Sequence, residues 1–295
     1  MPQRKIISEN LEALNSLKDL AESYEEIAVI RMQKIKDSVL KTRDFLQELS
    51  DVFVDLKASY DRDVKELLAK RKSRDKSILP LLQKNGKTLM VYLSSNGRLY
   101  GSVTQKTYKL LIADLKKPEG QASDLMIIGT AGRDMFEGSG INKPFSYFDI
   151  PDIGVDVKHI KELMTNFLQY DKVHVYYGKF DNVINQNPIG TSITGENIFE
   201  SEIVAPLARE DRFIFEPVLE KIFYFFETQI IANLFSQTLL ENQLARHASR
   251  VNAMEEALIH IDEESKKLQA AKRFLKHQLQ NKKQLETISG LAIWG

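Results

Sequence analysis

The 295-residue sequence contains no cysteine, which excludes disulfides, thiol nucleophiles, cysteine zinc sites and iron–sulfur clusters. It also has no excess of charge, because 41 Lys and Arg residues balance 41 Asp and Glu residues, and this argues against a general nucleic-acid binder. No apolar leader opens the chain, and the most apolar window, Val218–Phe235, is interrupted by charges and is too polar to span a membrane. We expect a soluble protein, or one that reaches a membrane through a partner, with no nucleic acid and no direct membrane insertion.

Both ends of the chain lack proline and glycine, the residues that interrupt helices. Residues 3–75 and Val218–Ser289 contain neither. Alternating steps of four and three are apolar at 14 of 18 positions between Ile7 and Leu67, and at nine of twelve between Leu240 and Leu279. Apolar repeats of this length are typical of coiled coils. The two apolar stripes need cover from water, and a compact middle keeps its two ends close, so we predict that the terminal helices pair antiparallel.

The middle of the chain has a different composition, with 12 of the 14 glycines and six of the eight prolines between residues 78 and 215. Short apolar runs alternate there with helical patterns, which predicts a parallel α/β sheet. The predicted domains are residues 1–77, 78–215 and 216–295. We predict strands at Leu89–Ser94, Leu125–Gly129 and Val173–Tyr177, helices at Val103–Lys116 and Val157–Tyr170, edge strands at 193–204 and 213–215, a last helix that opens at Pro217 and stops at Gly290, and a charged linker at Lys70–Lys76.

Two glycine-containing turns follow predicted strands. Gly97–Gly101 lies between a strand and a helix, where a turn can hold a phosphate, but it matches neither common phosphate-loop pattern. A structural turn is therefore favoured there, and a tight turn is favoured for Gly129–Asp134. Three nearby carboxylates, Asp149, Asp152 and Asp156, are better explained by a solvated loop than by an acid–base pair.

Histidines and basic residues give weaker signals. The five histidines show no metal-ligand spacing, and His247 falls on the apolar seam of the last helix, where we expect a packed or interfacial polar residue. The stretch Lys266–Lys283 carries seven basic residues, with no acidic residue between Ser265 and Leu285. It fits either a solvated helix face or a contact surface for an acidic partner.

Several motifs stand out in order over essentially the whole chain, namely Gly97–Gly101, Gly129–Phe136, Gly178–Asp181 with Pro188, Phe213–Pro217, Ser249–Met254 and Glu286–Ala292. Together they resemble the gamma subunit of F-type ATP synthases. Gly97–Gly101 resembles the family's Gly-Leu-Cys-Gly turn, with Tyr100 in place of the cysteine, and Lys276-His277 stands where the family has Arg-Gln.

This resemblance implies an α/β fold with long terminal helices, namely an antiparallel two-helix coiled coil plus a Rossmann-like α/β domain. It implies a non-catalytic shaft inside a ring of alpha and beta subunits, with an epsilon-type subunit and a membrane c-ring as further partners. The chain would bind no cofactor, and ATP, ADP and Mg would lie in the partner subunits. The implied location is cytoplasmic, peripheral on the inner membrane of a bacterium. The implied ring contacts are Arg31, Lys34, Arg250, Lys276, His277, Asn281, Leu291 and Trp294.

Other hypotheses stay open at this stage. Departures from the family's contact motifs, such as Lys276-His277, suggest a specialised F-type-like ATPase motor that is not used for ATP synthesis. The middle domain could instead be a nucleotide-binding α/β protein that dimerises through coiled-coil arms. A plain coiled-coil tether is a further alternative, but it leaves the α/β domain unexplained.

Overall fold

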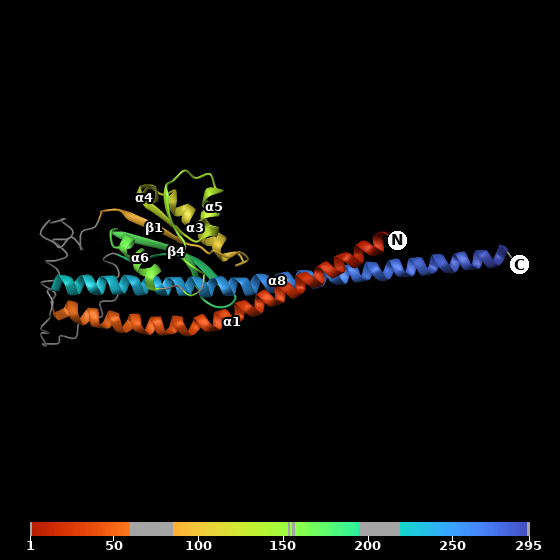
Figure 1. Cartoon of the computed structure of the whole chain (residues 1–295), viewed down its shortest axis with the longest axis horizontal. Coiled ribbons are helices and arrows are strands. Elements are labelled where there is room, and N and C mark those ends of the chain that lie inside the picture. Colours follow the sequence, from red (N-terminus) through yellow and green to blue (C-terminus); the bar gives the residue numbers. More distant parts are fainter. Residues whose placement is uncertain (1, 60–84, 153, 155–156, 195–218, 294–295) are drawn as a thin grey trace. The chain divides into compact units, whose positions relative to one another are not determined.

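The computed structural model describes residues 2–59, 85–152, 154, 157–194 and 219–293 (Figure 1). It divides into two compact units, one formed by Met1–Ile30 with Arg250–Gly295 and the other by Arg31–Ser249. Each unit is described by itself below. The elements are α1 (Pro2–Ser59), β1 (Thr88–Leu93), α3 (Val103–Leu115), α4 (Pro118–Ala122), β2 (Asp124–Ile128), α5 (Thr130–Glu137), β3 (Phe145–Phe148), α6 (Val157–Phe167), β4 (Lys172–Phe180), β5 (Gln186–Ser192) and α8 (Leu219–Ile293).

A five-stranded sheet in the order β3-β2-β1-β4-β5 forms the middle of the larger unit. The first four strands in this order run parallel, and β5 pairs antiparallel with β4. The central strand β1 is buried on both faces: Leu89, Val91 and Leu93 face one side, while Met90 and Tyr92 face the other. Parallel strands read as continuous apolar runs when helices cover both faces, which is why this strand was visible in the sequence.

Helices cover the two faces of the sheet with separate apolar cores. On one face, Leu111 and Leu115 of α3 and Phe136 of α5 pack against β1 and β2. On the other face, α6 and the first part of α8 meet over the sheet, where the rings of Phe167 and Phe235 lie edge to face at 5.0 Å. The N-terminal part of α8 is therefore a structural helix of the α/β domain.

The smaller unit holds the first turns of α1 and the last turns of α8. Lys18 of α1 forms an ion pair with Asp262 of α8 at 3.0 Å, and the guanidinium of Arg250 lies 5.5 Å from the ring centre of Tyr24. From the first of these contacts to the second, the residue number rises on α1 and falls on α8, so the two helices run antiparallel, as predicted. Among the helices that the structure describes, none is both long and apolar enough to cross a membrane.

Most of the predicted elements are confirmed, three predictions are wrong, and two strands were not foreseen. Gly129–Asp134 is not a tight turn, since α5 begins at Thr130; Gly132 is there because a Cβ would lie 2.6 Å from the Ser94 side chain. The last helix continues through Gly290 to Ile293, because one glycine weakens a helix by only about 1 kcal/mol. The edge strand predicted from Ile193 is wrong at its start, because Ile193 and Thr194 follow a strand that ends at Ser192. The strands β3 and β5 were not foreseen. The predictions for 70–76, 195–204 and 213–217 lie outside the described residues.

Candidate functional site

One face of α8 changes from apolar to polar where it passes the end of the sheet. Ile231, Phe235 and Leu239 follow one another at helical spacing and pack on the sheet. The same spacing continues with Asn242 and Arg246, and both side chains are buried. Buried polar groups need hydrogen-bond partners, so this change predicts that the polar half of the face meets backbone groups that the sheet has left unpaired.

The structure shows these backbone groups at the ends of β1 and β4. Asn242 Nδ2 donates to the Leu93 carbonyl at 3.4 Å, and the Gly178 amide donates to Asn242 Oδ1 at 3.1 Å. Arg246 Nη1 donates to the Ser94 carbonyl at 3.2 Å. Two side chains of α8 therefore complete the hydrogen bonding of two strands, which fixes the register of the helix on the sheet.

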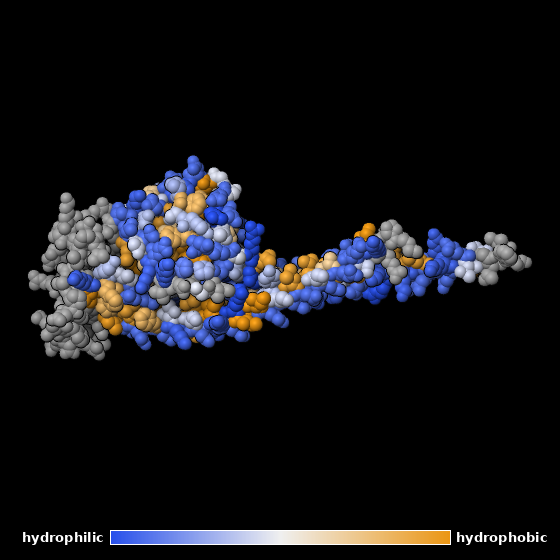
Figure 2. Space-filling view, in the orientation of Figure 1, coloured by the Kyte–Doolittle hydropathy of each residue, from blue (hydrophilic) through white to orange (hydrophobic). Residues whose placement is uncertain are grey.

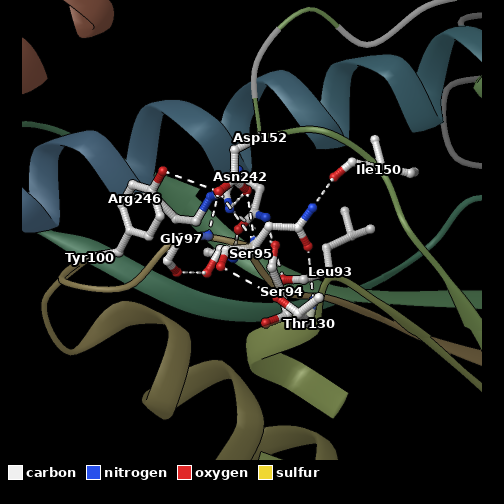
Figure 3. Close-up of polar contacts among 12 residues, drawn as sticks. Leu93, Ser94, Ser95, Gly97, Tyr100, Thr130, Ile150, Asp152, Asn242 and Arg246 are labelled. Atoms are coloured by element: carbon white, nitrogen blue, oxygen red, sulfur yellow. Dashed lines mark hydrogen bonds and ion pairs between the residues drawn. The ribbon is translucent and has the colours of Figure 1, made fainter. Parts of the chain in front are cut away.

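The carboxylate of Asp152 lies at the centre of this junction (Figure 3). It accepts hydrogen bonds from the backbone N–H groups of Asn96, at 3.1 Å, and Gly97, at 2.7 Å, and it pairs with Arg246 Nη1 at 2.6 Å. Tyr100 Oη lies 3.4 Å from the same carboxylate, and the Arg246 guanidinium stacks over the Tyr100 ring at 4.9 Å. The side chains of Asp152 and Arg246 are 17% and 5% exposed, so this is a buried ion pair.

The electrostatics of the junction hold Asp152 in its charged form. Burial alone would raise the pKa of this carboxyl group. The positive charge of Arg246 and the N–H groups of Gly97 and Asn96 outweigh that effect, so the pKa of Asp152 lies below its ordinary value. The Asp152 carboxylate therefore stays negatively charged at neutral pH.

The hydrogen bonds to Asp152 show the role of the turn at Gly97–Gly101. Its amide groups at Asn96 and Gly97 are already bound to Asp152, so the turn acts as a structural turn, as the sequence favoured. The prediction that Asp152 is a solvated residue is wrong, because its partner Arg246 is 94 positions away along the chain and invisible to local patterns. Asp149 is exposed and accepts a hydrogen bond from the Asn96 side chain, while Asp156 lies outside the described residues.

The same stretch of α8 holds two further buried polar side chains, Glu241 and His247. Glu241 accepts hydrogen bonds from Tyr177 Oη at 3.4 Å and from Gln237 Nε2 at 3.1 Å. His247 is 2% exposed and its ring lies edge-on to Tyr100 at 5.8 Å, which confirms the expectation of a packed residue. Within the part of the chain that the structure describes, no group of His, Asp and Glu side chains is arranged to hold a metal ion.

The ring contacts implied by the resemblance fall on both long helices. On α1, Arg31 is half-buried and Lys34 is exposed; on α8, Arg250 is buried and packs over Tyr24. These positions remain predictions, because no partner subunit is present. Arg250 therefore contributes to the contact between α8 and α1.

The remaining predicted contacts lie farther along α8. Lys276, His277 and Asn281 are exposed and close together in sequence, about 39 to 47 Å along the helix from Arg250 at ~1.5 Å per residue. Every position from 276 to 289 is exposed, and Figure 2 shows mostly hydrophilic surface with scattered apolar residues along this part of the helix. The side chain of Leu291 and the whole of Trp294 lie outside the described residues.

Sequence reasoning found the exposed helix but missed the junction residues Asn242 and Arg246. A usable signal was present, since the apolar face formed by Ile231, Phe235 and Leu239 continues at the same spacing into polar residues. A helix face that changes in this way marks the place where packing on a sheet gives way to hydrogen bonding at its edge.

Comparison with known proteins agrees with this architecture. A family model described as ATP synthase matches residues 3–275. The chain is 26% identical over 265 residues to the ATP synthase gamma chain of Mycoplasmopsis pulmonis and 22% identical over 265 residues to that of Pelotomaculum thermopropionicum, with 87% of each chain covered in both cases.

Solved structures show the same fold at lower identity. A chain of the Euglena gracilis mitochondrial ATP synthase, in a structure titled OSCP/F1/c-ring, superposes with a TM-score of 0.66 at 14% identity, covering 99% of this chain and 94% of that chain. A chain from the central stalk and c-ring of the Tetrahymena thermophila enzyme gives a TM-score of 0.54 at 19% identity, covering 81% and 99%.

The chain combines a unit of paired helices with an α/β unit, and its matches are central-stalk proteins. The chain belongs to the ATP synthase gamma-chain family, whose members form the central stalk of F-type ATP synthases. None of these comparisons supports the hypothesis of a specialised motor.

Proposed function

We propose that this chain is the central rotor shaft of an F-type rotary ATPase. It couples rotation to ATP synthesis or hydrolysis in a ring of alpha and beta subunits and to proton or sodium translocation through a membrane c-ring. An epsilon-type subunit binds the α/β domain. The family membership supports this role, and the stiff paired helices fit the mechanical demand on a shaft.

The observation that carries the proposal is the exposed end of α8. All described positions from Lys276 to Ser289 are exposed, and they include large apolar side chains such as Leu285 at 67% and Ile288 at 64%. A helix of about this length is only marginally stable alone in water. Its continuous helical form together with its apolar side chains is therefore best explained by a partner that surrounds it. Lys276, Lys282 and Lys283 add the positive charge that an acidic partner surface would attract.

In the proposed role, the chain is not an enzyme by itself and binds no cofactor. The turn that could have held a nucleotide phosphate is bound to Asp152, which supports this assignment. ATP, ADP and Mg would be held by the alpha and beta subunits. The complex would lie on the cytoplasmic side of the inner membrane of a bacterium, with this chain peripheral to the membrane.

Truncation of the last helix tests the proposal. Deleting the chain from Leu275 onward removes the exposed segment and should weaken assembly of the ring or its torque, whereas deleting Leu291–Gly295 should leave folding and assembly intact. Both variants are compared in a purified complex by ATPase activity and subunit content. An assembled, rotating ATPase that is unaffected by the longer deletion would show that the shaft assignment is wrong.

A further inference from the structure

Four hydrogen-bond donors from two separate parts of the chain converge on the carboxylate of Asp152, and one of them is the Tyr100 hydroxyl at 3.4 Å. Asn96 and Gly97 provide N–H groups from the turn after β1, and Arg246 provides a guanidinium from α8 (Figure 3). Asp152 itself belongs to the segment that follows β3. One carboxylate thus joins a strand–helix turn, a loop and a long helix at one edge of the sheet.

This arrangement occupies a distinctive place in the fold. In nucleotide-binding open α/β sheets, the turn between the first strand and the following helix lies at the carboxyl edge and binds phosphate through its backbone N–H groups. The turn after β1 leads into α3 in this way, and its N–H groups hold a carboxylate that the chain supplies itself. The guanidinium of Arg246 is a donor that suits carboxylate and phosphate alike.

We propose that Asp152 is a built-in anion that fills a phosphate-like cradle and fastens the α/β domain to α8, so that load passes between the domain and the shaft helix through Arg246. The transfer of load rests on the proposed function, whereas the cradle is a feature of this chain alone.

The two backbone donors distinguish this proposal from a simple ion pair. If charge attraction alone held the junction, exchanging the two charges in the double variant Asp152→Arg and Arg246→Asp would restore it. An arginine at position 152 has no acceptor to offer to the N–H groups of Asn96 and Gly97, so we expect the exchange to fail. Recovery of wild-type thermal stability by the exchanged pair would overturn the proposal.

Chemical rescue of the full-length chain tests the cradle directly. Asp152→Ala empties the cradle and keeps its donors, so sodium formate or potassium phosphate should raise the midpoint of thermal unfolding by about 2 °C or more relative to sodium chloride at equal ionic strength. Asp149→Ala is the matched control, because Asp149 is an exposed neighbour that accepts from the Asn96 side chain. Asp152→Asn keeps the size of the side chain and should show a lower midpoint without rescue, because the cradle stays filled. If formate and phosphate stabilise Asp152→Ala, Asp152→Asn and Asp149→Ala equally, the proposal of an anion cradle is wrong.

The load statement is tested in the assembled complex. The Asp152→Ala complex should keep ATP hydrolysis but lose at least half of the rotation or ion transport per ATP hydrolysed, and formate should restore part of it. Unchanged coupling in this variant would overturn the role of the junction in load transfer. If the wild-type chain fails to enter an alpha–beta ring at all, the proposed function fails, while formate rescue of the isolated chain would still support the cradle.

Discussion

Arg246→Met isolates the energetic role of the buried junction, because methionine keeps much of the side-chain volume and removes the charge. The variant leaves the Asp152 carboxylate without its guanidinium partner and the Ser94 carbonyl without a donor. Removing one member of a buried ion pair costs about 3–5 kcal/mol. Asp152 is 17% exposed and keeps its two backbone donors, so we expect a value near the lower end, about 3 kcal/mol.

The assay for this prediction is urea unfolding of the full-length chain, followed by near-ultraviolet circular dichroism of the tyrosines in the α/β domain. Arg133→Met is the matched control, since Arg133 is 38% exposed and stacks on the Tyr147 ring, and we expect it to cost less than about 1 kcal/mol. The double variant Arg246→Met with Asp152→Asn should lose about 1–3 kcal/mol less unfolding free energy than the two single variants lose in sum. A loss below about 1 kcal/mol for Arg246→Met, or strict additivity of the two changes, would refute the reasoning.

Three further predictions concern the larger unit. Gly101→Ala should lower the unfolding midpoint clearly more than Gly140→Ala, because both residues have positive φ but only a Cβ at Gly101 would clash with the Ser249 carbonyl. Equal effects of the two changes on the midpoint would contradict this packing. Phe235→Ala should cost about 3–5 kcal/mol in urea unfolding, because the ring is fully buried, and a loss under about 1 kcal/mol would be inconsistent with the core described. The lowered pKa of Asp152 adds stability that is fully present above the ordinary pKa of 3.8 and is lost as pH falls through the lower pKa of the folded state. Acid should therefore lower the unfolding free energy of the wild type more steeply than that of Asp152→Asn. Parallel plots of unfolding free energy against pH would argue against this role of Asp152.

The sequence predicted the parts of the fold that follow from local periodicity. The long helices were visible because seven-residue repeats persist without proline or glycine, and β1 was visible because a strand covered on both faces is a continuous apolar run. The strand at 186–192 was missed because Pro188 and Gly190 read as loop residues, although an edge strand tolerates both. The helix at 130–137 was missed because Gly132 reads as a turn residue, whereas it allows close packing on the sheet.

The junction could not be predicted from local patterns, because its partners are far apart in the sequence. Asp152 stands in a stretch with other carboxylates, which made a solvated loop the natural expectation. Its burial depends on Arg246, which reaches it only after the sheet and α8 have packed together. The exposed face at Lys276, His277 and Asn281 was predicted from the family resemblance, and its role as a contact surface stays a prediction until a partner is observed.

Native mass spectrometry of the complex that purifies with the tagged full-length chain tests the central claim most directly. The account predicts one copy of this chain together with three copies of each of two larger nucleotide-binding subunits, and loss of that assembly when the chain is cut at Leu275. Recovery of the chain alone or as a simple homodimer, with no ring of larger subunits, would contradict it.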